Sequence, residues 1–374
     1  MIMASGCVKD DPTGPDGSIN EDTYSITIGG DNSESAHSMS LHLSGGVVIA
    51  GEIDSNVSDA YVAYVGTNDT LVWDRTFGGN DTDRLFGIIT AANGDLVGVG
   101  TSARDFWIIR ISPAGDLIWQ RTYDVGPLDE GAGITEANNG DLLLAGTFLV
   151  TLTSFDKHLI RVTSTGDVIW SRTFDHAQFD AVSDVIATSD GGFVIVGQSS
   201  NPQGGAAQTQ VFKIDSLGNE LWNKQYGTSG EYSARDIALF PDGRIVVVGG
   251  VNSNGPSGLD PYVLLLSATG EQLDEYVIAR PNYNDAGGVA IAADGNLVVA
   301  GTSSEPGRDR EVYLFKLQLD GTVQWERTYG DVFSDRGSDV VISGDRIYTC
   351  GTSEREKGCC TDVRLIKTDL DGLL

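Results

Sequence analysis

The stretch Asn93–Tyr123, NGDLVGVGTSARDFWIIRISPAGDLIWQRTY, decides the fold. It holds three short apolar runs that are rich in β-branched and aromatic residues and are separated by turn residues, a pattern typical of strands rather than helices. With the run just before it, the stretch predicts a unit of four antiparallel strands: Gly87–Ala91, Leu96–Gly100, Phe106–Ile111 and Leu117–Tyr123. Tight turns join the first strand to the second and the third to the fourth, whereas the other two links are longer.

The same unit recurs along the whole chain. A glycine closes the second strand of each unit, at intervals of 46 to 52 residues: Gly51, Gly100, Gly146, Gly197, Gly249, Gly301 and Gly351. A turn glycine precedes most last strands, and a tryptophan usually follows it four residues later. A long internal period marks a repeat architecture. Seven such units predict an all-β fold, a seven-bladed β-propeller with four-stranded antiparallel blades, in which radial repetition protects most sheet edges.

The two chain ends predict how the ring closes. The chain stops at Asp371–Leu374, where an outer strand should begin, while Tyr24–Gly30 (YSITIGG) aligns with Trp73–Gly79 (WDRTFGG). We therefore expect the strand 23–28 to complete blade seven. Residues 23–374 then form a single propeller domain, with blades at about 36–77, 84–123, 131–174, 181–226, 233–278, 285–329 and 336–372.

Residues 1–22 are expected to lie outside this domain. Ala4–Cys7 (ASGC) is similar to the lipobox of lipoproteins, in which the cysteine is acylated after signal cleavage, but the charged and apolar regions of a signal peptide are missing. Either the first residues are a signal remnant or the match is chance. On the first interpretation Cys7 carries a lipid, Val8–Asp22 is a flexible tether, and the protein is anchored in the cell envelope, at the outer membrane or cell surface; otherwise it is secreted.

Composition and motifs narrow the function classes. The chain has 53 acidic and 24 basic residues and a formal net charge of -29, which repels nucleic acid and anionic lipid. We therefore expect no nucleic-acid partner and no membrane contact except through a lipid anchor. Neither a G-x-S-x-G elbow, a P-loop nor an H-E-x-x-H motif occurs, and no pair of histidines has metal-ligand spacing. The sequence thus predicts a non-enzyme without an organic cofactor.

The inner strand of each unit should line a central channel. Its first channel-facing slot aligns as Ser38, Gly87, Gly133, Asp184, Asp236, Gly288 and Asp339. The three aspartates are candidate ligands for a cation or a sugar; alternatively, each accepts backbone N–H bonds from the neighbouring blade. His37 and Arg235, one position earlier in their strands, are expected at the rim and complete the candidate ligand-binding set.

Two further groups of residues offer site chemistry. Asn80, Asp81 and Asp83, in an acidic link after an outer strand, offer oxygen ligands that suit Ca²⁺, although their spacing is not that of an EF-hand. Cys350 ends a second strand, and Cys359 and Cys360 follow in the next link. A disulfide from Cys350 to either neighbour would clip that link, and a Cys359–Cys360 bridge is the rarer alternative.

The outer strands carry a repeated aromatic–arginine–aromatic pattern, as in Trp119, Arg121 and Tyr123. We interpret it as a clamp between blades, because it recurs in most units. Unit five differs, since Asp274 stands where tryptophan is expected and Tyr276 where arginine is. That difference is either neutral drift or a docking edge for a partner.

The unit resembles the repeats of secreted or lipid-anchored β-propellers of bacteria and archaea, and Ala114–Trp119 (AGDLIW) is similar to the tryptophan repeat of quinoprotein propellers. The resemblance implies a binding or scaffolding role at the cell envelope. We therefore expect a non-catalytic envelope lipoprotein that binds a protein or a glycan, as part of a membrane-associated complex. The alternative is a hydrolase or lyase acting on polysaccharide with carboxylates at the channel mouth. Two carboxylates about 5–9 Å apart in an open pocket would favour the enzyme, and carboxylates bonded to backbone amides the binder.

Overall fold

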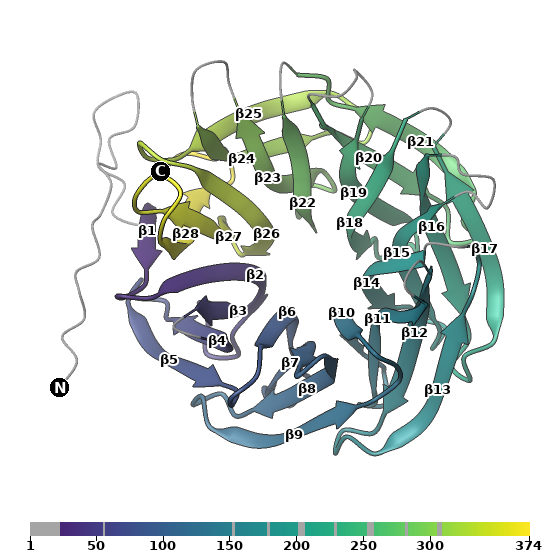
Figure 1. The fold of residues 1–374 in the computed structure, drawn as a ribbon. Helices are drawn as coiled ribbons and strands as arrows, with labels where there is room; N and C mark the ends of the chain where they lie inside the picture. Colours follow the sequence, from purple (N-terminus) through teal and green to yellow (C-terminus); the bar gives the residue numbers. More distant parts are fainter. Residues whose placement is uncertain are drawn as a thin grey trace.

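Seven four-stranded antiparallel sheets surround a central axis in the computed structural model (Figure 1). The structure describes residues 23–374, except 55–56, 152–153, 178–179, 201–205, 228–229, 253–257, 281–282 and 305–308. The expected all-β, seven-bladed propeller is confirmed. Cys7 and the expected lipobox and tether lie outside the described residues. Within the described residues, no helix is long and apolar enough to cross a membrane.

The blades are formed by consecutive strands. Blade one contains β2 (Ser33–Leu41), β3 (Val47–Asp54), β4 (Ser58–Val65) and β5 (Leu71–Phe77), and blade two contains β6 (Asp83–Thr90), β7 (Leu96–Ser102), β8 (Asp105–Ile111) and β9 (Leu117–Tyr123). Blade three contains β10 (Asp129–Glu136), β11 (Leu142–Thr151), β12 (Ser154–Val162) and β13 (Val168–Phe174), and blade four contains β14 (Asp180–Ala187), β15 (Phe193–Ser200), β16 (Ala207–Ile214) and β17 (Glu220–Tyr226).

The remaining blades follow the same order. Blade five contains β18 (Tyr232–Leu239), β19 (Ile245–Val251), β20 (Asp260–Leu266) and β21 (Gln272–Val277), and blade six contains β22 (Asn284–Ile291), β23 (Leu297–Ser304), β24 (Arg310–Leu317) and β25 (Val323–Tyr329). Blade seven contains β26 (Asp335–Ser343), β27 (Arg346–Glu354), β28 (Thr361–Asp369) and β1 (Tyr24–Ile28). The inner strands begin a few residues earlier than the sequence predicts.

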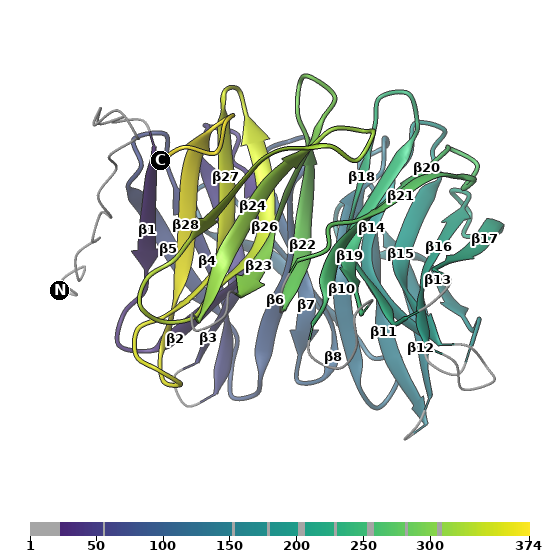
Figure 2. The same ribbon diagram turned by 90° about the horizontal axis from the view of Figure 1, so that it is seen from above.

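The strands stand side by side around the axis, and their connections lie on two opposite faces (Figure 2). Because neighbouring strands in a blade are antiparallel, the short turns fall on one face, which we call the turn face. The links from second to third strands and from outer to inner strands fall on the other, which we call the link face. Loops that vary in sequence and length are therefore gathered on the link face, as the sequence predicts.

The N-terminal strand closes the ring. Strand β1 pairs with β28 in antiparallel register, so that Tyr24 lies opposite Lys367, Ile26 opposite Leu365 and Ile28 opposite Val363. Blade seven thus takes three strands from the C-terminal end of the chain and one from the N-terminal end. The predicted closure is confirmed, and the last edge of blade seven is covered.

Among the described residues, the hydrophobic core is divided into seven clusters, one between each pair of neighbouring blades. Between blades seven and one, for example, Ile26 and Leu365 pack against Ile49 and Ala63. This division follows from the period-two alternation of the strands, because each sheet buries both faces against a neighbour. Each blade therefore depends on both neighbours for its burial, and no blade can be removed without exposing two faces.

The outer strands clamp each blade to the next one. The ring of Trp73 in blade one lies on the turn glycine Gly115 of blade two, and its Nε1 donates to the carbonyl oxygen of Pro113 at 3.3 Å. Gly115 has a φ of 87°, and a Cβ there would come within 2.9 Å of the indole ring. Glycine is therefore required both by the backbone conformation and by the contact with the ring. In blade five, Tyr276 takes the place of the tryptophan: its ring lies on Gly321 and its hydroxyl donates to the Leu319 carbonyl at 2.8 Å. The sequence difference in unit five is thus compensated within the chain.

Candidate functional site

Every inner strand carries a β-bulge at the same place. The register with the second strand shifts between Ala36 and Ser38 in blade one, and at the equivalent positions in the six other blades. A bulge adds one unpaired residue and re-aims the side chains around it. It therefore turns two successive residues of each inner strand toward the axis, and this arrangement builds the lining of the channel.

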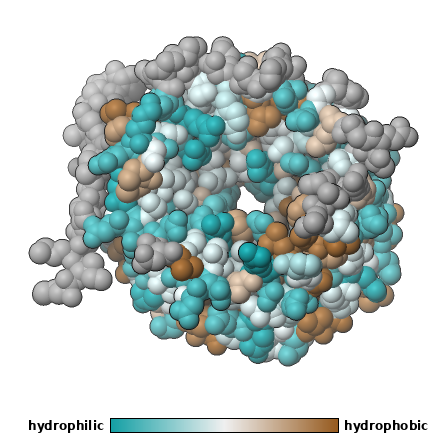
Figure 3. Space-filling model, in the orientation of Figure 1, coloured by the Kyte–Doolittle hydropathy of each residue, from teal (hydrophilic) through white to brown (hydrophobic). Residues whose placement is uncertain are grey.

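The channel encloses a cavity of about 310 Å³, and the ring is open at its centre in the space-filling view (Figure 3). The structure brings together all five predicted channel residues. Asp184, Asp236, Asp339, His37 and Arg235 all line this one cavity. The three aspartates directly follow the bulges of blades four, five and seven. His37 and Arg235 are the unpaired residues of the bulges in blades one and five.

The three carboxylates are bonded to backbone amides. Asp236 accepts from its neighbour Ile237 N at 2.7 Å and from Val289 N of blade six at 2.6 Å. Asp339 likewise accepts from Val340 N and from Met39 N of blade one, both at 2.7 Å. Asp184 accepts from Val185 N in its own strand and from Ile237 N of blade five. Each aspartate thus links its own blade to the next one, as in the alternative interpretation of this slot.

Blades without an aspartate fill the same slot differently. In blade one, Ser38 Oγ accepts from Ile88 N of blade two at 3.3 Å, so a hydroxyl takes the bridging role of the carboxylate. In blades three and six the slot holds Gly133 and Gly288, and a Cβ there would come within 3.0 Å of the Asp184 or Asp339 side chain of the next blade. Glycine therefore makes room for the carboxylate beside it.

Burial favours the protonated form of these acids. Burial, followed by the charge of Asp339, raises the pKa of Asp184 to about 7, and burial, followed by the charge of Asp236, raises the pKa of Asp339 to about 7. Burial and the neighbouring charge of Asp184 raise the pKa of Asp236 well above its usual range. The carboxyl groups of Asp184 and Asp236 hydrogen bond to each other, which requires one proton between them. The three acids form a coupled group that holds protons near neutral pH.

This coupled group predicts a pH dependence of stability. Because the folded pKa values lie above the unfolded ones, the folded chain binds more protons between about pH 4 and pH 7, and the free energy of unfolding falls as the pH rises through that window. The channel admits water, so we expect a modest loss, roughly 1–2 kcal/mol between pH 5 and pH 8. The variant Asp236→Ser, which copies the slot of blade one, should flatten this dependence.

Thermal unfolding of the wild type and of Asp236→Ser at pH 5, 6, 7 and 8 measures the effect. The comparison between the two chains cancels the contributions of the other acidic residues, which both chains share. An equal slope in the two chains would show that the channel aspartates are ionised throughout this range.

His37 is engaged by a cluster of charges at the rim. Its Nε2 lies 3.4 Å from Glu52 Oε1, and its ring centroid lies 5.3 Å from that of Phe86. Arg84 Nε also contacts Glu52, at 2.5 Å. Burial raises the pKa of Glu52, but hydrogen bonds from His37 and Ser58 and the charge of Arg84 bring it down to about 2. The rim on this side is therefore a fixed network, whereas Arg235 is exposed on the opposite side of the channel.

The predicted Ca²⁺ ligands line a shallow space on the link face. Asn80, Asp81 and Asp83 border a cavity of about 180 Å³, in which Asp83 is buried and the other two are exposed. Asp83 Oδ2 accepts from Gly79 N at 2.9 Å. Among the described residues, the groups of three acidic, cysteine or histidine side chains that are close enough to share an ion do not include Asp81 or Asp83.

Cys350, Cys359 and Cys360 are free in the structure, so the possible bridge from Cys350 to Cys359 or Cys360 is not formed there. Cys350 is buried in the core between blades seven and one, whereas Cys359 and Cys360 lie in the link after β27. Four residues of extended strand separate Cys350 from the end of β27 at Glu354, roughly 13 Å. Cys360 lies at that same end, because its neighbour Thr361 pairs with Glu354, so the separation from Cys350 exceeds the reach of a disulfide. The sulfurs of Cys359 and Cys360 lie 2.8 Å apart as thiols.

Two groups of aspartates at the link face were not predicted from the sequence. Asp105, Asp124 and Asp129 meet between blades two and three, and Asp156, Asp175 and Asp180 meet between blades three and four; in each group the carboxylate oxygens lie within 4.8 Å of one another. We call these the first and second acidic junctions. A signal was present in the sequence, because both groups share the spacing D-x18-D-x4-D.

Comparisons with known proteins place this architecture. The chain is 25% identical to the regulatory protein FlaEY of Caulobacter vibrioides over 194 residues, which are 44% of this chain and 20% of that protein. The match thus spans only about a fifth of the length of the relative.

Solved structures share the fold at low sequence identity. The WD40 propeller domain of Doa1 is 12% identical, covers 91% of this chain and 94% of its own, and superposes with a TM-score of 0.59. Sqt1 from Chaetomium thermophilum (11%, covering 92% and 83%) and domains 1–2 of Drosophila Semaphorin 1b (10%, covering 92% and 86%) both give a TM-score of 0.55. These likenesses concern the fold alone.

A family model matches a larger part of the sequence. The PQQ_2 model, described as outer membrane protein assembly factor BamB, matches residues 104–330. The match begins at the hairpin of blade two and ends after the outer strand of blade six, and it covers more than half of the chain. It agrees with the quinoprotein-like tryptophan repeat in the outer strands. The chain therefore belongs to the family described as outer membrane protein assembly factor BamB.

Proposed function

We propose that this protein is a non-catalytic propeller of the cell envelope, held there by a lipid on Cys7, that binds a protein partner within a membrane-associated complex. The observation that carries the proposal is the family match over residues 104–330, because the family description is that of an assembly factor at the outer membrane. Assembly factors act by contact with other proteins, and a rigid ring with exposed edges suits that task.

The channel supports a binding role over a catalytic one. A general acid or base needs a proton or lone pair that reaches the substrate. The oxygens of Asp236 and Asp339 are occupied by backbone amides of two blades, and Asp184 is bonded in the same way. These contacts hold the ring together around its axis. Carboxylates that are bonded to backbone amides in this way favour a binding protein over an enzyme.

The outer edges of blades one to three offer a surface for a partner. Each outer strand there begins with a pair of exposed apolar side chains, between 37% and 55% exposed: Leu71 and Val72, Leu117 and Ile118, and Val168 and Ile169. We call these six residues the edge belt. The same strands are the open edges of their sheets, with backbone groups that are free to pair. Apolar side chains beside unpaired backbone are what an added strand of a partner recognises.

Purification of the tagged protein from native membranes in a mild detergent tests the proposal. We expect a complex with a defined protein partner at fixed stoichiometry, and loss of that partner from the double variant Leu117→Ser/Ile118→Ser. The control variant is Val332→Ser, because Val332 is 82% exposed but lies on the link face. All three chains should unfold at the same temperature. The proposal is contradicted if the protein is extracted from the membrane without a partner. It is also contradicted if both variants retain the partner equally.

The alternative function, a hydrolase or lyase acting on polysaccharide through Asp184, Asp236 and Asp339, makes a different prediction. Activity on a panel of acidic and neutral polysaccharides should then be present in the wild type and absent from Asp236→Ser. Binding of a polysaccharide without turnover would instead identify the partner as a glycan.

A further inference from the structure

We propose that the first acidic junction, Asp105, Asp124 and Asp129, is a binding site for a divalent cation of the Ca²⁺ class. The site lies on the link face between blades two and three. It is distinct from the channel and from Asn80, Asp81 and Asp83, and it does not depend on the proposed envelope function.

The geometry of the three carboxylates suits one ion. They come from the start of β8, the link after β9 and the start of β10, and each brings an oxygen to within 4.8 Å of the others. Oxygens that share a Ca²⁺ ion at 2.3–2.6 Å lie at most about 5 Å apart. Asp129 is fully buried, whereas Asp124 is exposed, so the junction has a buried floor and an open side through which an ion can enter.

One oxygen at this junction has no partner. Asp129 Oδ2 accepts from Val125 N at 2.7 Å and from Gly126 N at 3.0 Å. The other oxygen, Oδ1, is buried and accepts no hydrogen bond from the described part of the chain. Leaving a buried carboxylate oxygen without a donor is costly, and such atoms in native structures usually face water or an ion. This oxygen is an acceptor that the protein itself leaves unsatisfied.

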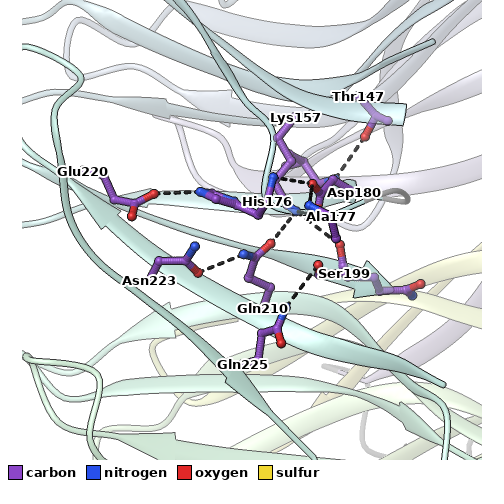
Figure 4. A network of polar contacts seen from close by, with 12 residues as sticks. Thr147, Lys157, His176, Ala177, Asp180, Ser199, Gln210, Glu220, Asn223 and Gln225 are labelled. Atoms are coloured by element: carbon purple, nitrogen blue, oxygen red, sulfur yellow. Dashed lines mark hydrogen bonds and ion pairs between the residues drawn. The ribbon is translucent and has the colours of Figure 1, made fainter. Parts of the chain in front are cut away.

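The second acidic junction shows what occupies the equivalent place. There Asp180 Oδ2 accepts from His176 N and Ala177 N, both at 2.8 Å, as Asp129 Oδ2 does from its own link. Its Oδ1 accepts from the ammonium of Lys157 at 2.7 Å (Figure 4). The atom that corresponds to the unpartnered Asp129 Oδ1 is therefore the one that binds a cation supplied by the protein.

The first junction lacks such a cation. The residue at the position of Lys157 in blade two is Phe106, which pairs with Tyr123 as Lys157 pairs with Phe174. Within the described chain, no lysine, arginine or histidine forms an ion pair with Asp105, Asp124 or Asp129.

Two other junctions between blades also contain a cationic side chain beside an aspartate. Arg364 contacts Asp331 at 2.6 Å between blades six and seven, and Arg355 contacts Asp362 at 3.3 Å between blades seven and one. Of the two acidic junctions, the second has Lys157, whereas the first has no ion pair with a lysine, arginine or histidine among the described residues. Burial raises the pKa of Asp129, and the charges of Asp105 and Asp124 add to that rise. A metal ion would supply the missing positive charge.

The ligand set selects the class of ion. Three carboxylates and no nitrogen or sulfur ligand favour a hard cation over Zn²⁺ or Cu²⁺. The open side leaves room for water ligands, which Ca²⁺ accepts in a flexible shell of six to eight oxygens, whereas Mg²⁺ demands a near-ideal octahedron.

Thermal unfolding and titration calorimetry with CaCl₂ test the proposal on the full chain. We expect Ca²⁺ to raise the melting temperature of the wild type beyond the effect of NaCl at equal ionic strength, since any salt screens a chain of net charge -29. The variant Asp124→Asn, which alters an exposed ligand, should lose at least about tenfold in Ca²⁺ affinity. The matched control is Asp175→Asn at the equivalent position of the second junction, where Lys157 is in place, and it should bind Ca²⁺ like the wild type.

Three outcomes would overturn the proposal. The first is a wild type whose melting temperature responds to CaCl₂ no more than to NaCl. The second is an Asp124→Asn chain that binds Ca²⁺ as tightly as the wild type. The third is an equal loss in Asp175→Asn, which would show that the response reflects the overall acidic surface rather than this junction.

Discussion

A chain that starts at Asn32, and so lacks β1, is expected to lose cooperative unfolding or to aggregate. Tyr24, Ile26 and Ile28 are buried in the core between blades seven and one, and burial of side chains of this size contributes roughly 1.5–3 kcal/mol each. The free energy lost with these three side chains therefore approaches the whole free energy of unfolding of a typical domain, roughly 5–15 kcal/mol. It also opens the edge of β28, whose Val363 and Leu365 would face solvent. Circular dichroism and scanning calorimetry measure the effect against a chain that starts at Glu21.

Single substitutions in β1 separate the effect of losing a buried side chain from the effect of shortening the chain. Ile26→Ala should lower the free energy of unfolding by about 2–5 kcal/mol, because Ile26 is 3% exposed and packs against blade one. Thr27→Ala, next to it on the less buried side of the strand, should have a small effect. Equal unfolding temperatures for the chains that start at Asn32 and Glu21 would mean that blade seven is stable with three strands and does not need β1 to close the ring.

The fold could be predicted because its determinants are local and repeated. The spacing of Gly51 to Gly351 sets the number of units, and period-two alternation sets the strands within each. The closure could be predicted too, since Tyr24–Gly30 has the pattern of an outer strand and aligns with Trp73–Gly79. The channel residues followed from the same alignment, because one slot in every unit points to the axis.

The acidic junctions could not be predicted in the same way, because their members belong to different units. Asp105 and Asp129 occupy different slots, and an alignment of units does not show that the third strand of one blade meets the inner strand of the next. Only the packing angle between blades brings them together. The spacing D-x18-D-x4-D was visible, but without a structure it is one of many acidic patterns in a chain with 53 acidic residues.

Blade five and the cysteines show two further limits of one-dimensional reasoning. Asp274 in place of tryptophan suggested a gap, yet Tyr276, two residues further on the same face, reaches the next turn glycine. Cys350 is nine residues from Cys359 in sequence, which suggested a bridge. In an extended strand each residue adds about 3.3 Å, so residues that are close in sequence can be too far apart in space for a disulfide.

The variant Lys157→Met should be among the least stable single substitutions in the protein. Lys157 is fully buried, and its ammonium donates to Asp180 at 2.7 Å and to the side chain of Gln210 (Figure 4). It also donates to the Gln198 carbonyl. Burial lowers the pKa of this lysine, and the charge of Asp180 opposes that change. Methionine keeps the volume but leaves Asp180 without its counter-ion, and breaking a buried pair on one side costs about 3–5 kcal/mol. Urea unfolding of the two chains gives the difference.

The double variant Lys157→Met/Asp180→Asn separates lost packing from the stranded charge. It should recover a large part of the stability, because neither ion remains to be compensated. A second rescue follows if the two junctions are equivalent: Ca²⁺ should stabilise Lys157→Met by replacing the ammonium, and should do so much less in the double variant, which lacks the Asp180 carboxylate. A Lys157→Met chain as stable as the wild type would contradict the stabilising role of the Lys157–Asp180 ion pair. Failure of Ca²⁺ to stabilise the single variant would mean that the second junction needs a tethered cation, because its Oδ1 is closed to solvent.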